Sequence, residues 1–227
     1  LRPESQMATG DWAPRCPCCQ TPVEPMATSE EARQNSNSIY ALTKQDQEAM
    51  TLNIGQTYGI PTVALRYFNV YGPRQSLSNP YTGVMAIFMS RLLHDRPPVV
   101  YEDGLQTRDF ISVHDIVRAN MLALERPEAN DQTFNVGSGV PITIRGVAEV
   151  AATYAGKDIA PEITGKFRKG DVRHCYADMS RIRERLGFVP QTSFEEGMRE
   201  IAVWSRSVES EDRFDVATAE LKAKGLV

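Results

Sequence analysis

The sequence predicts an α/β fold built on a doubly wound parallel sheet, and two local patterns support this class. A run of strong helix formers over 38–58 is followed at once by the short β-branched and apolar run 61–66. A second strand-like segment passes through the glycine turn 134–139 into helical residues 143–154. The chain has 227 residues, 41% of them hydrophobic and 24% charged, which is enough apolar material for a sizeable core.

Composition limits the partners that we expect. A formal net charge of -4 offers no general basic surface, so nucleic acid is not expected as a partner. No apolar run approaches the about 18 residues that a membrane span needs, and no signal peptide opens the chain. We therefore expect a cytoplasmic protein without membrane contact.

The first 37 residues mix Gly, Pro, Ser, Asn and Gln without periodicity, which predicts a loop or insertion. Within it, Cys16 and Cys19 have the spacing of two thiolates that bind one zinc ion. Only half of a tetrahedral site is present, because no second Cys or His pair follows and the single later cysteine is Cys175. Structural zinc and free thiols in a loop are the two interpretations.

Tyr40 and Lys44 stand at the start of the predicted helix 38–58, which ends near Gly59. Four residues are about one helical turn, so both side chains should project from the same face. A nearby ammonium group favours the phenolate, so Lys44 is expected to lower the pKa of Tyr40 from about 10 and make it a general acid/base. The alternative is an exposed tyrosine beside a solvated lysine, since such pairs occur by chance in many helices.

The strand 61–66 leads into the loop-rich stretch 67–83, which should lie near ligand because doubly wound sheets bind ligands outside the carboxyl ends of their strands. An apolar helix over 84–93 is expected to be core, and a small strand over 99–101 follows it. A helix over 113–125 is expected to bury five apolar side chains at helical spacing: Ile116, Val117, Ala119, Met121 and Leu122.

The glycine turn at 137–139 is not a cofactor fingerprint, because position 142 is Ile where a third glycine would be needed. Further along, Asp178 is predicted to cap a short helix, and Ser193 with Glu196 forms a capping box for another. The charged segment 208–224 predicts a solvated terminal helix.

Several segments together resemble one known family. They are Ser38–Lys44, Val63–Arg74, Arg108–Asp115 and Phe134–Gly139. From about 38 to 204 the chain resembles the extended short-chain dehydrogenase/reductases, the NAD-dependent nucleotide-sugar epimerases and dehydratases. Within that family the segments 16–19, 78–83 and 170–175 are most similar to the dTDP-L-rhamnose 4-epimerases.

The resemblance implies the carboxyl-terminal part of a Rossmann-like sheet together with a small α/β substrate-binding domain. It implies a division into four regions: a loop or insertion at 1–37, a partial dinucleotide-binding domain at 38–75 and 108–140, a substrate-binding domain at 76–107 and 141–206, and a terminal helix at 207–227. A full member would carry, ahead of Leu1, more than about a hundred residues with a glycine-rich cofactor loop and a catalytic Ser or Thr.

The resemblance also implies roles for individual residues. Tyr40 and Lys44 would be catalytic and would contact NAD, Lys44 by a hydrogen bond to the nicotinamide ribose, and Phe68 would lie beside the nicotinamide. The substrate-binding residues would be Asn69, Arg74, Tyr101, Arg108, Arg168 and Asp171, with the arginines on the diphosphate and Asp171 on the ribose.

The activity so implied is inversion at C4 of dTDP-L-rhamnose or a related nucleotide hexose, through a 4-keto intermediate and with NAD. We expect this chain by itself to be an incomplete and inactive form. A 4,6-dehydratase, a UDP-glucose 4-epimerase and a nonenzymatic remnant that binds nucleotide sugars are the alternatives. The resemblance also implies a homodimer as a partner arrangement, paired in part through the helix that carries the tyrosine.

Overall fold

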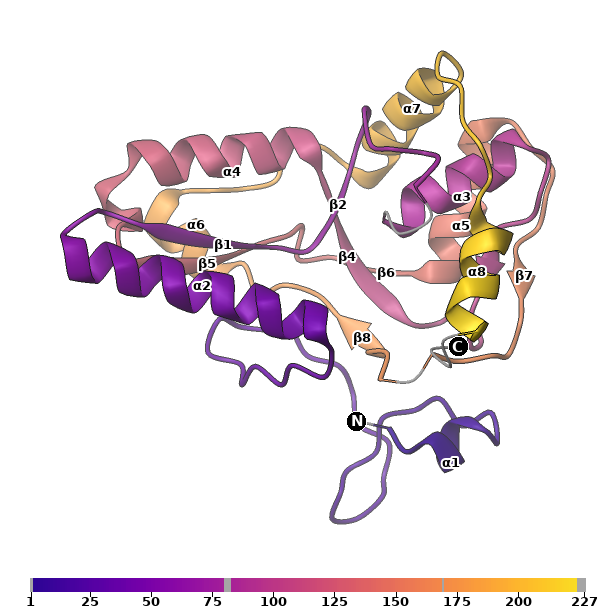
Figure 1. The fold of residues 1–227 in the computed structure, drawn as a ribbon, viewed down its shortest axis with the longest axis horizontal. Helices are drawn as coiled ribbons and strands as arrows, with labels where there is room; N and C mark the ends of the chain where they lie inside the picture. The colour runs from indigo at the N-terminus through magenta and orange to yellow at the C-terminus, as the bar shows by residue number, and fades with distance from the viewer. Residues whose placement is uncertain (1, 80–82, 169, 224–227) are drawn as a thin grey trace.

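The computed structural model describes residues 2–79, 83–168 and 170–223. Helices and mainly parallel strands alternate along most of the chain (Figure 1), which confirms the predicted α/β class. No helix of the described residues is long and apolar enough to cross a membrane. The amino-terminal segment, with the short helix α1 (Glu4–Met7), lies at the bottom of Figure 1.

The predicted helix boundaries follow from local capping. Helix α2 (Ile39–Tyr58) begins where the Ser38 hydroxyl accepts a hydrogen bond from the Ala41 amide, and it ends at Gly59, which adopts the left-handed conformation. Helix α7 (Phe194–Ser205) begins with the complete capping box of Ser193 and Glu196. Each of these ends is therefore fixed by residues within a few positions of it.

The predicted helices over 84–93, 113–125 and 143–154 and the small strand over 99–101 are also present, whereas the strand at 69–71 forms within the stretch that was expected to be loop. Helix α6 (Ser180–Leu186) starts two residues after Asp178, whose carboxylate accepts a hydrogen bond from the Ser180 amide. The remaining helices are α3 (Val84–Leu93), α4 (Val113–Glu125), the 3-10 turn η1 (Pro127–Ala129), α5 (Ile144–Ala155) and α8 (Phe214–Ala223). The strands are β1 (Val63–Tyr67), β2 (Asn69–Tyr71), β3 (Val99–Val100), β4 (Thr107–Ser112), β5 (Gln132–Val136), β6 (Pro141–Thr143), β7 (Glu162–Ile163) and β8 (His174–Cys175).

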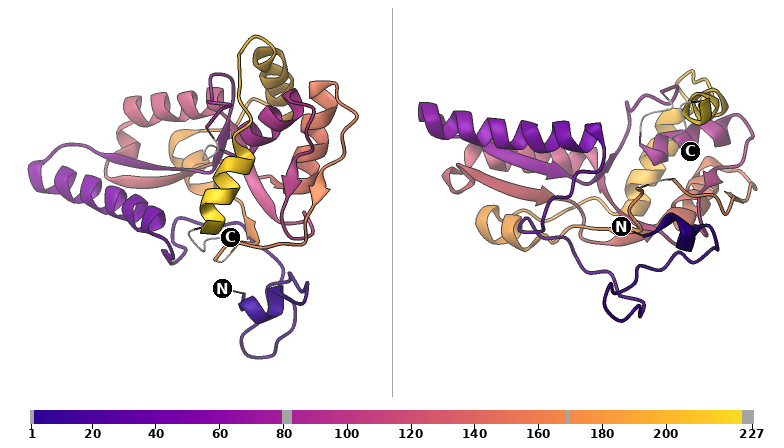
Figure 2. Two further views of the ribbon diagram at one scale, coloured as in Figure 1. Left: turned by 45° about the vertical axis from the view of Figure 1, so that its right-hand side comes forward. Right: turned by 60° about the horizontal axis from the view of Figure 1, so that its bottom comes forward.

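Three small sheets organise the described chain. Strands β1 and β5 pair in parallel, β2 and β8 pair in parallel with β4, and β3 pairs in parallel with β7. Only the β4–β6 pair is antiparallel among these. Figure 2 shows α2 and α4 flanking the β1–β5 pair, while α3, α5 and α7 gather at the other end of the molecule.

Two apolar clusters form the core. One joins α3, α5 and α7 around Phe88, Leu92 and Met198, and the other joins α4, β5 and α6 around Phe134 and Ile182. Burying a side chain of this size stabilises the fold by about 1.5–3 kcal/mol. Strand β4 contributes Phe110 to the first cluster and Ile111 to the second, so its alternating side chains connect the two.

The prediction for α4 was wrong for two of its five apolar residues. Val117 and Met121 are 56% and 47% exposed, and Leu124 one turn further is 81% exposed. Strand β1 pairs only with β5 among the described residues, so no described layer covers this side of α4. Helix α2 on the other face is also mostly exposed, with only Gly55 buried among its 20 residues.

The terminal helix is less solvated than its charge pattern predicts. Asp212, just before α8, pairs with Arg91 of α3, and the Arg91 guanidinium lies 4.8 Å from the centre of the Phe214 ring. These contacts hold the start of α8 against α3.

Candidate functional site

Tyr40 and Lys44 lie on one face of the first turns of α2, as their spacing predicts. The Lys44 ammonium nitrogen is 5.7 Å from the centre of the Tyr40 ring and also donates a hydrogen bond of 3.2 Å to Gln47. Tyr40 is 72% exposed, so its hydroxyl is accessible to a ligand. The local helix geometry therefore delivers a phenol and an ammonium group together.

These two residues line a cavity of about 670 Å³ between α2 and β1. Its wall is fixed by Arg66 of β1, which donates hydrogen bonds of 2.7 and 2.6 Å to the Glu48 carboxylate of α2. Hydrogen bonding to Arg66 lowers the pKa of Glu48 below its ordinary value. A paired charge thus holds the tyrosine helix against the strand.

A second polar cluster surrounds Arg108 on β4. Its guanidinium donates a hydrogen bond of 2.9 Å to the Asp171 carboxylate and another of 3.2 Å to the carbonyl of Arg173. Parallel pairing of β8 with β4 brings these residues together, and His174 hydrogen-bonds Thr107 at 2.9 Å across the same pair. The structure therefore unites Arg108 and Asp171, which are 63 positions apart.

Beside this cluster, Arg168 stacks on Tyr101, with its guanidinium carbon 4.5 Å from the ring centre. Gly170 is linked to the start of the tyrosine helix, because the Asn37 side chain donates a hydrogen bond of 2.9 Å to its carbonyl. Asn37 precedes Tyr40 by three residues, so this bond connects the start of the tyrosine helix with the residue before Asp171.

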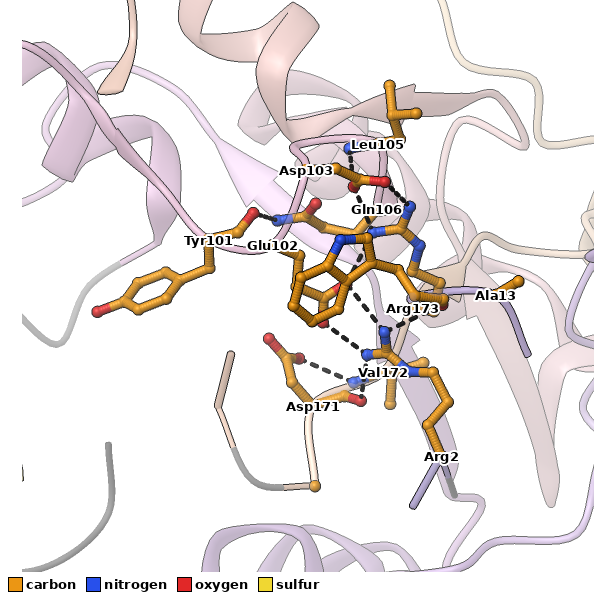
Figure 3. A network of polar contacts seen from close by, with 12 residues as sticks. Arg2, Ala13, Tyr101, Glu102, Asp103, Leu105, Gln106, Asp171, Val172 and Arg173 are labelled. Carbon is orange, nitrogen blue, oxygen red and sulfur yellow. Dashed lines mark hydrogen bonds and ion pairs between the residues drawn. The ribbon is translucent and has the colours of Figure 1, made fainter. Parts of the chain in front are cut away.

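Figure 3 shows an ion-pair network that the sequence did not indicate. Buried Glu102 accepts hydrogen bonds from Arg2 at 2.7 and 2.9 Å and from Arg173 at 2.7 Å, and Arg173 also binds Asp103. Arg2 further donates to the Asp171 carbonyl at 3.3 Å. Nothing in the pattern of residues 1–37 singled out Arg2.

The remaining predicted site residues lie around β2. Asn69 pairs with Phe110, two positions after Arg108, so it stands on the strand next to the Arg108 cluster. Arg74 adopts a left-handed backbone conformation in the following turn, with φ of 68°. Phe68 packs against the second apolar cluster. None of these three side chains lines the cavity that contains Tyr40.

The backbone amides of the glycine turn after β5 bind the side-chain carboxylate of Asp109. Buried Asp109 accepts hydrogen bonds from the amides of Ser138 and Gly139 at 2.7 and 2.9 Å, and from the Ala177 amide at 3.0 Å. A Cβ at Gly137 would lie 2.4 Å from this carboxylate. The turn is therefore filled by Asp109, in agreement with its rejection as a cofactor loop.

The zinc interpretation of Cys16 and Cys19 is not supported. Among the residues that the structure describes, no group of three or more His, Cys, Asp or Glu is arranged to hold a metal ion. All four cysteines are free, and Cys175 lies apart on β8, so the pair lacks the further ligands that a tetrahedral site requires. Hydrogen bonds from Thr21 and Cys16 instead lower the pKa of the Cys19 thiol to about 7.

Comparison with known proteins adds to this geometry. A family model described as GDP-mannose 4,6 dehydratase matches residues 22–201. A dTDP-L-rhamnose 4-epimerase of Burkholderia thailandensis is 40% identical over 168 residues, which are 74% of this chain and 46% of that protein. The chain spans about half the length of the curated relatives it matches.

Two solved structures are also similar. One is the UDP-N-acetylglucosamine 4-epimerase from Methanobrevibacter ruminantium, in complex with UDP-N-acetylmuramic acid. It superposes with a TM-score of 0.75 at 37% sequence identity, and the matched region covers 80% of this chain and 58% of that one. The other is the UDP-glucuronic acid 4-epimerase from Bacillus cereus, in complex with UDP-glucuronic acid and NAD. It superposes with a TM-score of 0.74 at 27% sequence identity, and the matched region covers 82% of this chain and 58% of that one.

Proposed function

The chain belongs to the extended short-chain dehydrogenase/reductase family of NAD-dependent nucleotide-sugar epimerases and dehydratases, and from this premise we propose that it carries the catalytic and substrate-anchoring part of a nucleotide-sugar 4-epimerase. The proposed substrate is dTDP-L-rhamnose or a related nucleotide hexose, whose C4 is inverted through a 4-keto intermediate. The 40% identity to the Burkholderia enzyme favours the rhamnose nucleotide. The family model, which describes a 4,6-dehydratase, favours that reaction as the alternative.

The Tyr40–Lys44 pair carries this proposal. In it, the Tyr40 phenolate takes the proton of the sugar 4-hydroxyl and returns a proton once the ketone has turned over in the site. Lys44 lies on the same face of the helix, with its ammonium nitrogen over the tyrosine ring. An exposed phenol at the mouth of a cavity of about 670 Å³ can reach a bound sugar without a rearrangement of α2.

The described residues fit the nicotinamide half of NAD. Tyr40 and Lys44 face the open cavity, where they would hold the nicotinamide ribose. The family resemblance assigns Phe68 a place beside the ring, although its side chain packs against the second apolar cluster and does not line this cavity. When bound, NAD supplies the acceptor and donor of the C4 hydride. The glycine turn at 137–139 does not fit the pyrophosphate, because Asp109 already engages its amides.

The anchor for the nucleotide is assigned to the Arg108 cluster. Arg108 and Arg168 present guanidinium groups suited to two phosphate oxygens, and Asp171 is assigned to the ribose hydroxyls. Asn69, Arg74 and Tyr101 complete the assigned set. A firmly held diphosphate with a loosely held sugar lets the 4-keto intermediate present either face to the same cofactor.

Calorimetric titration of the purified chain with dTDP, UDP and NAD, followed by an epimerase assay with dTDP-L-rhamnose, tests the proposal. We expect dTDP or UDP to bind, Arg108→Ala to abolish that binding, and the matched surface variant Arg145→Ala to retain it. We expect little NAD binding and no turnover, since α2 has one buried residue and β1 one partner strand among the described residues. Failure of both nucleotides to bind would contradict the assigned anchor.

A nonenzymatic nucleotide-sugar binder is the second candidate. The observation that favours it is the contrast between the paired charges around Arg108 and the sparse packing of the tyrosine helix. Epimerase turnover by the 227-residue chain would exclude the nonenzymatic binder. It would also contradict our expectation that this chain by itself is inactive.

A further inference from the structure

The proposed function does not use the cysteine segment 15–22, although this segment has a defined shape. Arg15 and Pro22 form an isolated antiparallel bridge. Between them the Cys16 amide donates to the Thr21 carbonyl, and the Gln20 amide donates to the Cys16 carbonyl, both at 2.9 Å. Gln20 takes a left-handed backbone conformation, with φ of 59°, to close the turn. The two cysteine positions are thereby held on one tight loop.

The thiols of this loop are close to each other and accessible. The Thr21 hydroxyl lies 3.0 Å from the Cys19 sulfur, and hydrogen bonding to Thr21, and then to Cys16, lowers the pKa of the Cys19 thiol to about 7. Cys19 is exposed and Cys16 is partly exposed. Donors aimed at a sulfur favour its thiolate, which is the form that attacks a disulfide.

We propose that Cys16 and Cys19 are a reactive dithiol that closes to an intramolecular disulfide by exchange with small-molecule disulfides. The Cys19 thiolate attacks one sulfur of the oxidant, forms a mixed disulfide and releases one thiolate. The Cys16 thiol then loses its proton and attacks the Cys19 sulfur, releasing the second thiolate. In sum, two protein thiols are oxidised and one external disulfide is reduced to two thiols.

Geometry separates this pair from the other cysteines. Adjacent Cα atoms such as those of Cys18 and Cys19 are about 3.8 Å apart, below the about 4.4–6.8 Å that disulfides usually span. Cys175 lies on β8, where burial raises the pKa of its thiol. Cys16 is therefore the resolving partner for Cys19.

Oxidation of the reduced, full 227-residue chain with glutathione disulfide tests the assignment, read by intact mass and peptide mapping. We expect the loss of two hydrogens within the peptide that contains 16–19, also in Cys18→Ser and Cys175→Ser. Cys16→Ser should stop at a glutathione adduct on Cys19, and Cys19→Ser should react more than about tenfold more slowly. Far-UV circular dichroism of each variant checks that the fold is retained.

Three outcomes would overturn the proposal. They are a stable glutathione adduct on the parent chain, a crosslink that involves Cys18 or Cys175, and stoichiometric zinc retained with all thiols unreactive. Because none of these readouts uses nucleotide or sugar, the result is independent of the proposed epimerase function.

Discussion

Asn37 and Gly170 are 133 positions apart, yet the Asn37 side-chain amide donates a hydrogen bond of 2.9 Å to the Gly170 carbonyl. Gly170 has φ of 76°, and a Cβ there would approach the Asn37 amide nitrogen to 2.9 Å. This contact joins the residue before the Ser38 cap of α2 to the segment that carries Asp171. It is the direct link between the proposed catalytic tyrosine and the proposed nucleotide anchor.

Asn37→Ala should weaken nucleotide binding without unfolding the chain. One hydrogen bond contributes about 0.5–1.5 kcal/mol, so the Kd for dTDP or UDP should rise by up to about tenfold. Calorimetry measures the affinity, and Ser36→Ala, which removes the neighbouring bond to Gln45, is the matched control. An equal effect in both variants would show that the link itself has no role.

Tyr40→Phe and Lys44→Met should leave stability and nucleotide affinity nearly unchanged. Both side chains belong to the exposed face of α2, so the free energy of unfolding should change by less than about 0.5 kcal/mol. Urea denaturation and dTDP titration measure the two quantities. A large loss of stability in either variant would assign the pair a structural role in place of a chemical one.

Asp109→Ala should be strongly destabilising. The substitution leaves the amides of Ser138, Gly139 and Ala177 without their buried acceptor, at about 1–3 kcal/mol for each unsatisfied group. We expect a loss of more than about 3 kcal/mol in urea denaturation. The control, Asp158→Ala at an exposed position, should change stability little, and a small effect at Asp109 would mean that water replaces the carboxylate.

Stability should fall in acid partly through Glu48. Hydrogen bonding to Arg66 lowers the pKa of Glu48 below its ordinary 4.5 in the folded chain. The stabilisation is therefore complete above about pH 4.5 and is lost as the pH falls through the lower folded value. Urea denaturation of Glu48→Gln at about pH 7 and at about pH 3 should show a stability difference from the parent that is larger at the higher pH. The exposed Glu184→Gln should show no such difference, and a pH-independent effect at Glu48 would contradict the ion pair.

The exposed apolar side of α4 should bind a hydrophobic dye in the native state. Val117, Met121 and Leu124 form a continuous stripe at helical spacing beside the cavity between α4 and β1. Leu124→Gln should reduce the fluorescence of bound anilinonaphthalene sulfonate, whereas Val203→Gln on α7 should not. Equal fluorescence in both variants would locate the dye elsewhere.

Local chemistry allowed much of the fold to be predicted. The Ser38 cap, the Gly59 stop and the capping box at Ser193 depend on neighbours within one turn, so their positions can be read from the chain. The shared face of Tyr40 and Lys44 is equally local, since it follows from the helical repeat alone.

The tertiary structure decided which charges and faces are buried. Nothing within a few residues of Arg2 indicates that it pairs with Glu102, 100 positions away. The sequence of the glycine turn likewise does not indicate that the Asp109 carboxylate binds its amides. The exposure of Val117 and Met121 likewise depends on which strands lie beside α4. An amphipathic pattern indicates which face of a helix is apolar, but it does not indicate which other element packs on that face. Sequence alone thus determined the local elements and the reactive side chains of this protein, whereas long-range packing determined their partners, since burial and ion pairing depend on residues that only the folded chain brings together.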